Sequence, residues 1–156
     1  MAALSAQEWQ WVYALTGQTG SCIYMAPEVQ RCEPYNQAAD TFSFGVLAYE
    51  LLSRSMLVFT HLGGGMLPGV LTPEDYAARV ADGYRPERPQ SMTDDRVWEL
   101  VSSCWAADPN TRPAMTTVAQ ALQVLAAQQA GLEEAEAAQR QGSRGLLAQC
   151  GLCHIQ

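Results

Sequence analysis

Residues 38–52 read AADTFSFGVLAYELL, and this stretch decides the fold of the 156-residue chain. Apolar side chains occur nearly all the way round a helix drawn through it, and such a helix belongs in a protein interior. At ~1.5 Å per residue the helix spans ~22 Å, which is too short for a membrane span, and Asp40 and Glu50 make it too charged for one. We therefore predict a buried central helix on which the rest of the chain packs.

The composition bounds the possible partners. With 48% hydrophobic and 16% charged residues, the chain can form one domain with a core. Its net charge of −7 argues against a nucleic-acid or membrane partner, because both favour basic patches. All nine basic residues are arginines, so the sequence contains no lysine. The first of them is Arg31, and without a basic leader region the expected location is the cytoplasm.

Five cysteines form an odd set without the spacing of a small secreted protein, so reduced thiols are expected. Only Cys150, Cys153 and His154 have a motif form, the C-x-x-C-H pattern of haem attachment. A haem or metal site there is one functional hypothesis. The other interpretation is a terminal tail that happens to contain two thiols.

Capping signals place the later helices. Thr72 and the following Pro73 predict a helix start, and the helix should stop at Gly83. A second start signal at residues 93–95 predicts a helix through Trp105. No stretch shows convincing strand-type alternation, so the predicted class is mainly α.

The helix after the Asp108 to Pro113 break is predicted to begin with Thr116 as its cap. Residues 126–141 are rich in Ala, Gln and Glu, which favours a solvated helical extension. A flexible tail is expected over residues 142–156.

Several motifs in this order resemble the second half of the carboxy-terminal lobe of a eukaryotic protein kinase. They are TGSCIYMAPE at 19–28, DTFSFG at 40–45, GYRP at 83–86, CW at 104–105 and DPNTRP at 108–113. Ser21 and Tyr24 stand as they do in tyrosine-kinase-like serine/threonine kinases. The resemblance implies a partial kinase lobe, with its helices packed around one buried central helix. It covers residues 16–125, after an irregular segment over 1–15, and the stretch 54–71 is identified as an insertion-like loop.

The resemblance also assigns roles along the central helix. Asp40 would accept hydrogen bonds from the backbone of a catalytic loop, or alternatively would be an ordinary N-cap. Leu47 and Leu51 would support the hydrophobic stack beneath the adenine, or would be generic core. Gly45 and Trp105 belong to the structural motifs of the family.

The end of the activation segment is assigned in the same way. Thr16 and Thr19 lie where activation-loop phosphorylation is common in the family, and a phosphate there would pair with an arginine. Ser21 resembles the hydroxyl that positions the catalytic aspartate, although a turn-stabilising hydroxyl is the alternative. Ala26, Pro27 and Glu28 form the A-P-E motif.

Phosphoryl transfer needs a Gly-rich loop, a phosphate-binding lysine and metal-binding acids. This sequence has no G-x-G-x-x-G, H-R-D or D-F-G motif and no lysine. We therefore expect a fragment of a serine/threonine kinase domain that is not catalytic by itself, with no catalytic, cofactor or metal residues. ATP and Mg²⁺ are expected only for a complete family member. The expected partners are a protein substrate or the missing part of the kinase, and the alternative is a stand-alone kinase remnant that acts as a binding module.

Two structural expectations follow from the resemblance. Glu28 and Arg112, 84 positions apart, should form an ion pair, since the family ties its activation segment to the base of the lobe there. The alternative is two solvated charges that never meet.

The second expectation is an exposed apolar patch, unless the segment with Trp9 and Trp11 folds over it. Its residues are taken from Phe42, Val46, Leu47 and Tyr49.

Overall fold

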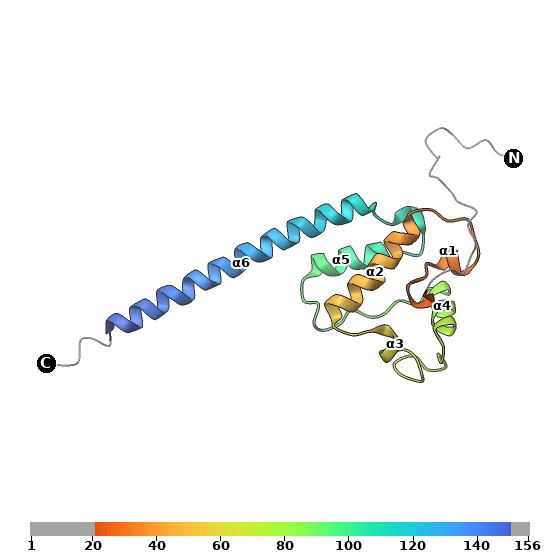
Figure 1. Ribbon diagram of the computed structural model, residues 1–156, viewed down its shortest axis with the longest axis horizontal. Helices are drawn as coiled ribbons and strands as arrows, with labels where there is room; N and C mark the ends of the chain where they lie inside the picture. The colour runs from red at the N-terminus through yellow and green to blue at the C-terminus, as the bar shows by residue number, and fades with distance from the viewer. Residues whose placement is uncertain (1–20, 151–156) are drawn as a thin grey trace, which may run out of the picture. The chain divides into compact units, whose positions relative to one another are not determined.

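The computed structural model describes residues 21–150, with side chains described to residue 140, and this part of the chain is helical without a β-strand (Figure 1). The predicted mainly α class is confirmed. The chain divides into two compact units, Met1–Met115 and Thr116–Gln156. The elements are η1 (Cys22–Tyr24), α1 (Pro27–Gln30), α2 (Ala38–Ser53), α3 (Leu57–Thr60), α4 (Pro73–Ala81), α5 (Asp95–Cys104), η2 (Pro109–Thr111) and α6 (Met115–Cys150).

The central helix α2 has the predicted extent. It begins after Asn36, whose side-chain oxygen accepts a hydrogen bond from the Ala38 N–H at 2.8 Å. Asp40 lies inside the first turn, so its interpretation as the N-cap is wrong, although an acid there suits the positive end of the helix dipole. The helix ends at Arg54, which adopts a left-handed conformation with φ of 54°.

α2 is buried on one face rather than all round. Phe42, Val46 and Tyr49 are at most 7% exposed, which contradicts the predicted exposed patch at these positions. Leu47 is 45% exposed and Leu51 69% exposed, so the patch prediction holds at Leu47, whereas the interpretation of Leu47 and Leu51 as core is wrong within the described structure. The described elements that pack on α2 are α5, η1 and η2, and they leave Leu47 and Leu51 uncovered.

Helix α5 packs closely on α2, and the two lie side by side in Figure 1. Gly45 makes this possible, because a Cβ atom there would lie 2.8 Å from the Cys104 Cβ and 3.3 Å from the Trp105 nitrogen. Real Cβ atoms do not approach other atoms as closely as 2.8 Å. Gly45 is therefore required by the packing of α5 and not by its own backbone conformation.

The predicted helix boundaries around α4 and α5 are confirmed to within one residue. Thr72 and Asp75 form a capping box at the start of α4, and Gly83 follows its end with φ of 102°. At α5 the capping side chain is Asp94, which accepts a hydrogen bond from the Arg96 N–H.

The predicted insertion-like loop, residues 54–71, contains a short helix and buried side chains. It contains α3, and Leu57, His61 and Val70 are at most 4% exposed. Phe59, by contrast, is 79% exposed. The segment thus packs on the core through Leu57, His61 and Val70, and Phe59 between them is exposed.

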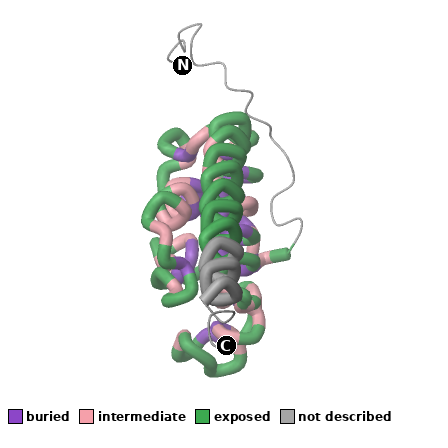
Figure 2. The backbone as a smooth tube through the Cα atoms, turned by 90° about the vertical axis from the view of Figure 1, so that its left-hand side faces the viewer, coloured by how far each residue is buried: buried purple, intermediate pink, exposed green. Residues whose placement is uncertain are grey.

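Helix α6 forms one continuous element. It begins at Met115, so Thr116 lies within the helix instead of capping it. It continues through the predicted start of the tail at Gly142 as far as Cys150, although Gly142 and Gly145 each cost a helix ~1 kcal/mol relative to alanine. Every residue from Ala126 to Arg140 is exposed, as the green tube of Figure 2 shows, in agreement with a solvated extension.

None of the helices among the described residues combines the length and apolar character that a membrane crossing requires.

Replacing Gly45 by alanine should destabilise the protein by ~2 kcal/mol, because the added methyl group overpacks the contact between α2 and α5. The measurement is urea unfolding followed by tryptophan fluorescence. Gly131→Ala is the control, since a Cβ at Gly131 meets nothing within 4 Å and alanine favours the helix. Equal unfolding midpoints for Gly45→Ala and the unchanged chain would contradict the packing role.

Candidate functional site

The A-P-E stretch forms a tight corner that buries an acid. Ala26 is extended, with φ of −69° and ψ of 149°, as expected before a proline. Pro27 occupies the first position of α1, where its missing N–H leaves no donor unpaired. Glu28 follows and is only 3% exposed, so its carboxylate needs a partner in the interior.

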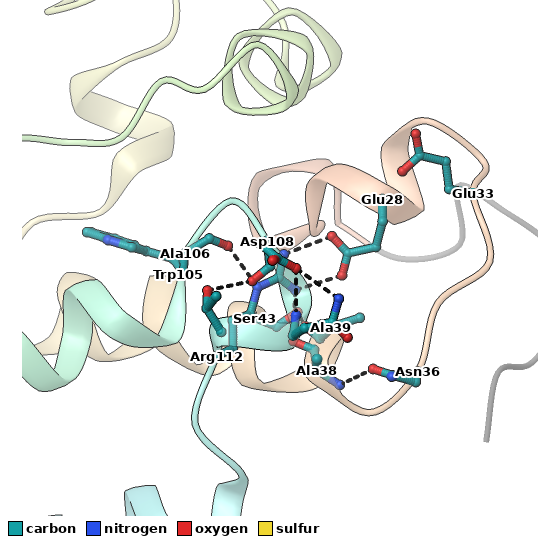
Figure 3. Close-up of polar contacts among 12 residues, drawn as sticks. Glu28, Glu33, Asn36, Ala38, Ala39, Ser43, Trp105, Ala106, Asp108 and Arg112 are labelled. Carbon is teal, nitrogen blue, oxygen red and sulfur yellow. Dashed lines mark hydrogen bonds and ion pairs between the residues drawn. The ribbon is translucent and has the colours of Figure 1, made fainter. Parts of the chain in front are cut away.

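Arg112 is that partner (Figure 3). Its two terminal nitrogens donate to the two carboxylate oxygens of Glu28 at 2.6 and 2.8 Å. Its Nε donates to the Ala106 carbonyl at 2.9 Å, and one terminal nitrogen also donates to the Ala38 carbonyl at 3.0 Å. The side chains of Arg112 and Glu28 are 0% and 4% exposed. The predicted ion pair is confirmed, and it joins α1, the start of α2 and the segment after α5.

A second arginine lies against the same core residue. The guanidinium carbons of Arg85 and Arg112 each lie 5.0 Å from the centre of the Phe42 ring. Arg85 also donates to the Trp105 carbonyl at 2.7 Å and to the Val80 carbonyl at 2.9 Å. Burial, and secondarily the charge of Arg112, lower the pKa of Arg85. Phe42 lies in the apolar core with both arginines against its ring, so the predicted patch does not extend to it.

Trp105 fixes the other end of the buried face. Its ring lies 5.3 Å from that of Tyr49 and 6.1 Å from that of Trp98, measured between centroids. Tyr49 also donates its hydroxyl to the Glu87 carbonyl at 3.1 Å. The packing of its ring against Tyr49 and Trp98 is a physical basis for the predicted structural role of Trp105.

Tyr24 and Glu50 form a polar link that the sequence analysis missed. The Tyr24 hydroxyl donates to one carboxylate oxygen of Glu50 at 2.5 Å, and the Leu57 N–H donates to the other at 2.6 Å. The hydrogen bond to Glu50, together with burial, raises the pKa of Tyr24 to about 12. The hydroxyl therefore stays protonated at neutral pH and holds η1 to the end of α2.

A hollow of about 220 Å³ opens between the end of the activation-segment motif and the first turns of α2. Ser43 lines it and donates its hydroxyl to the Tyr24 carbonyl at 2.8 Å, with the Ala39 carbonyl as a second acceptor at 3.1 Å. Asp40 also lines the hollow, is exposed, and makes no hydrogen bond or ion pair with the described residues. Such a carboxylate can accept hydrogen bonds from N–H groups that enter the hollow.

The remaining predicted residues are placed as follows. Ser21 lines the same hollow and is exposed, and its side chain caps no N–H of η1. Thr16 and Thr19 lie outside the described residues, as do Trp9 and Trp11. The proposed haem ligands, the Cys150 side chain, Cys153 and His154, also lie outside the described part. Among the described residues no group of three potential metal ligands is found.

Ser43, Glu50 and Arg85 are the residues that sequence reasoning left without a role. Ser43 and Arg85 stand inside motifs that were quoted for the resemblance, so their position was a usable signal. Glu50 carried a weaker one, an acid inside an apolar helix, which points to a buried partner.

Comparison with known proteins gives a consistent result. The protein tyrosine and serine/threonine kinase family matches residues 4–122. The serine/threonine-protein kinase VIK of Arabidopsis thaliana is 37% identical over 113 residues, which cover 72% of this chain and 23% of VIK. Serine/threonine-protein kinase STY17 of the same plant is 35% identical over 71% of this chain and 18% of its own length. Chicken vascular endothelial growth factor receptor 1 is 33% identical over 58% of this chain and 6% of the receptor. The chain thus spans less than a quarter of the length of each of these relatives.

Replacing Arg112 by alanine should destabilise the protein by ~3 to 5 kcal/mol, because it leaves the Glu28 carboxylate buried without a counter-charge. Arg96→Ala is the matched control. Its pair with Asp94 is half-exposed, so its loss should change the unfolding free energy by ~0 to 1 kcal/mol. Urea unfolding of both variants makes the comparison, and similar small losses in both would remove the special role of Arg112.

Replacing Leu51 by glutamine should change the stability by less than ~0.5 kcal/mol, because the side chain is 69% exposed. If the exposed Leu47 and Leu51 drive self-association, the variant should also self-associate less than the unchanged chain. Sedimentation and thermal melting measure the two effects. A melting temperature lowered by ten degrees would show that Leu51 belongs to the core.

Proposed function

Because this chain belongs to the protein tyrosine and serine/threonine kinase family, we propose that it is the substrate-side part of a serine/threonine kinase large lobe. In a complete kinase this part would support ATP-dependent phosphoryl transfer to a protein substrate. The observation that carries the proposal is the buried Glu28–Arg112 pair, which fixes the end of the activation segment on α2. A surface salt bridge between two random charges would not be desolvated in this way.

We propose further that the chain does not catalyse the transfer by itself. A protein kinase holds ATP and Mg²⁺ with a Gly-rich loop, a lysine and a pair of metal-binding residues. This sequence contains no lysine and none of the motifs that supply the other groups. The nucleotide site would therefore come from outside these 156 residues, which makes pseudokinase a less fitting description than partial kinase domain.

The hollow beside Asp40 supports the proposal that the rest of the kinase site comes from outside these 156 residues. Asp40 is an exposed carboxylate without a partner among the described residues, and it faces a space lined by Tyr24, Ser43 and the A-P-E corner. We propose that backbone N–H groups of a catalytic loop enter this space and donate to Asp40, as the family resemblance implies. The exposed Leu47 and Leu51 would be covered by the same missing part of the lobe.

We propose a cytoplasmic location because the cysteines whose side chains are described are free thiols. These are Cys22, Cys32 and Cys104. Such thiols accord with a reducing compartment.

A chimera tests the proposed function. Residues 16–125 would replace the matching segment of VIK, and phosphate transfer to a general serine- and threonine-containing protein would be measured. We expect a folded chimera to retain activity and the same chimera with Arg112→Ala to lose it. A folded chimera with no activity would overturn the proposal and favour a stand-alone binding module.

Millimolar Mg·ATP should leave the melting temperature of this chain unchanged, because a ligand stabilises a protein only through a site in the folded state. Differential scanning fluorimetry over a nucleotide series measures this. A saturable rise of several degrees would contradict the assignment of the nucleotide site to another part of the kinase.

A further inference from the structure

His61 is a buried titratable residue in the 54–71 segment that the kinase assignment leaves without a role. It follows α3 directly and is 4% exposed. Its Nδ1 lies 2.8 Å from the Thr60 hydroxyl oxygen, and its Nε2 lies 3.0 Å from the Tyr84 hydroxyl oxygen. The imidazole thus bridges the 54–71 segment and the chain that leaves α4.

The surrounding hydrogen bonds favour one proton arrangement on the ring. The Thr60 hydroxyl donates to the Met56 carbonyl at 3.3 Å, so its oxygen is left to accept from the Nδ1–H of His61. Nε2 is then the acceptor for the Tyr84 hydroxyl. Protonation of Nε2 would turn this acceptor into a donor, and Tyr84 would have to rotate its hydroxyl hydrogen away.

The cluster offers the imidazolium no counter-charge. The titratable groups that face the ring are Tyr76 of α4, at 5.8 Å between centroids, and Tyr84, at 6.0 Å, and both are neutral below pH 8. Charged groups act on the two tyrosines, Glu50 of α2 and Arg85 on Tyr76 and Glu87 on Tyr84, whereas burial is what lowers the pKa of His61. Within the described residues no carboxylate pairs with His61.

The loop that follows His61 in the sequence is held by a hydrogen bond to the neighbouring Thr60. The Met66 N–H donates to the Thr60 carbonyl at 2.7 Å, and a Cβ atom at Gly65 would lie 2.3 Å from that carbonyl oxygen. The loop is therefore folded tightly against the residue before His61. The segment that would move with His61 also contains Leu57 and Val70, which are at most 1% exposed.

We propose that His61 is a proton-sensitive latch, which holds the 54–71 segment on Tyr76 and Tyr84 when neutral and releases the segment when protonated. The sign follows from linkage. In the released segment His61 titrates near its ordinary pKa of about 6.5, whereas the closed form resists the proton. The latch is therefore fully effective above about pH 6.5 and weakens as the pH falls through that value.

Hydrogen exchange of the full 156-residue chain tests the latch. Protection of the amides of residues 57–62, corrected for the intrinsic pH dependence of exchange, should fall between pH 7.5 and pH 5.5, by up to about tenfold. Protection of α5 should change much less. Equal protection of residues 57–62 at both pH values would overturn the proposal, and so would a matching loss in α5, which would indicate general acid unfolding.

Variants separate the two histidines of the chain. His61→Gln, which keeps a hydrogen-bonding side chain but does not titrate, should abolish the pH dependence, whereas His154→Gln should preserve it. If His61→Gln does not fold, nuclear magnetic resonance titration of the imidazole signals in the His154→Gln chain decides the matter. A folded-state pKa for His61 at or above 6.5 would show that the closed form does not resist the proton and would overturn the latch.

Discussion

The buried guanidinium of Arg112 is the constraint on which the rest of the lobe depends. A charge with no exposed surface is tolerated only when its donors are paired and its charge is balanced. Glu28 supplies the balance, and the carbonyls of Ala38 and Ala106 complete the pairing. Segments distant in the sequence must therefore arrive together, because any one of them arriving alone would leave a buried charge or donor unsatisfied.

This requirement extends through α2 to α5. Gly45 lets α5 approach α2, and that approach brings the Trp105 carbonyl to the Nε of Arg85. Arg85 can then lie on Phe42, on which Arg112 also lies. The aromatic ring attracts both like charges, and each has its own acceptors, although one terminal nitrogen of Arg85 is buried without one. Gly45, which has only a hydrogen atom as its side chain, thus helps to determine where the long side chains of Arg85 and Arg112 can lie.

The features that the sequence predicted are of two kinds. Helix starts such as Thr72 with Asp75 are local, because the capping side chain and its N–H are only three residues apart. The Glu28–Arg112 pair is distant, and it was predictable only because both residues stand in motifs whose family relationship is known. Composition alone would have left both residues as solvated charges.

The features that escaped prediction depend on which face of a helix another element covers. Leu47 and Leu51 have the same apolar character as Val46, and only the positions of the elements packed on α2 make one buried and the others exposed. The Tyr24–Glu50 and His61–Tyr84 contacts join residues 26 and 23 positions apart. No periodicity within either segment specifies such contacts. The 54–71 segment was predicted as an insertion-like loop, but it is held by Leu57, His61 and Val70, which the local pattern does not distinguish from exposed side chains.

The separation of Glu28 and Arg112 also bears on how fast the lobe can fold. Helical proteins usually fold quickly, because most of their contacts join residues close in the chain. Here the decisive contact closes a loop of 84 residues, and Gly45 approaches Cys104, which lies 59 positions further along the chain (104 − 45). The entropy of these closures has to be lost before the buried charges are paired. The lobe is therefore expected to fold at the slower pace of proteins with many distant contacts, in spite of its helical content.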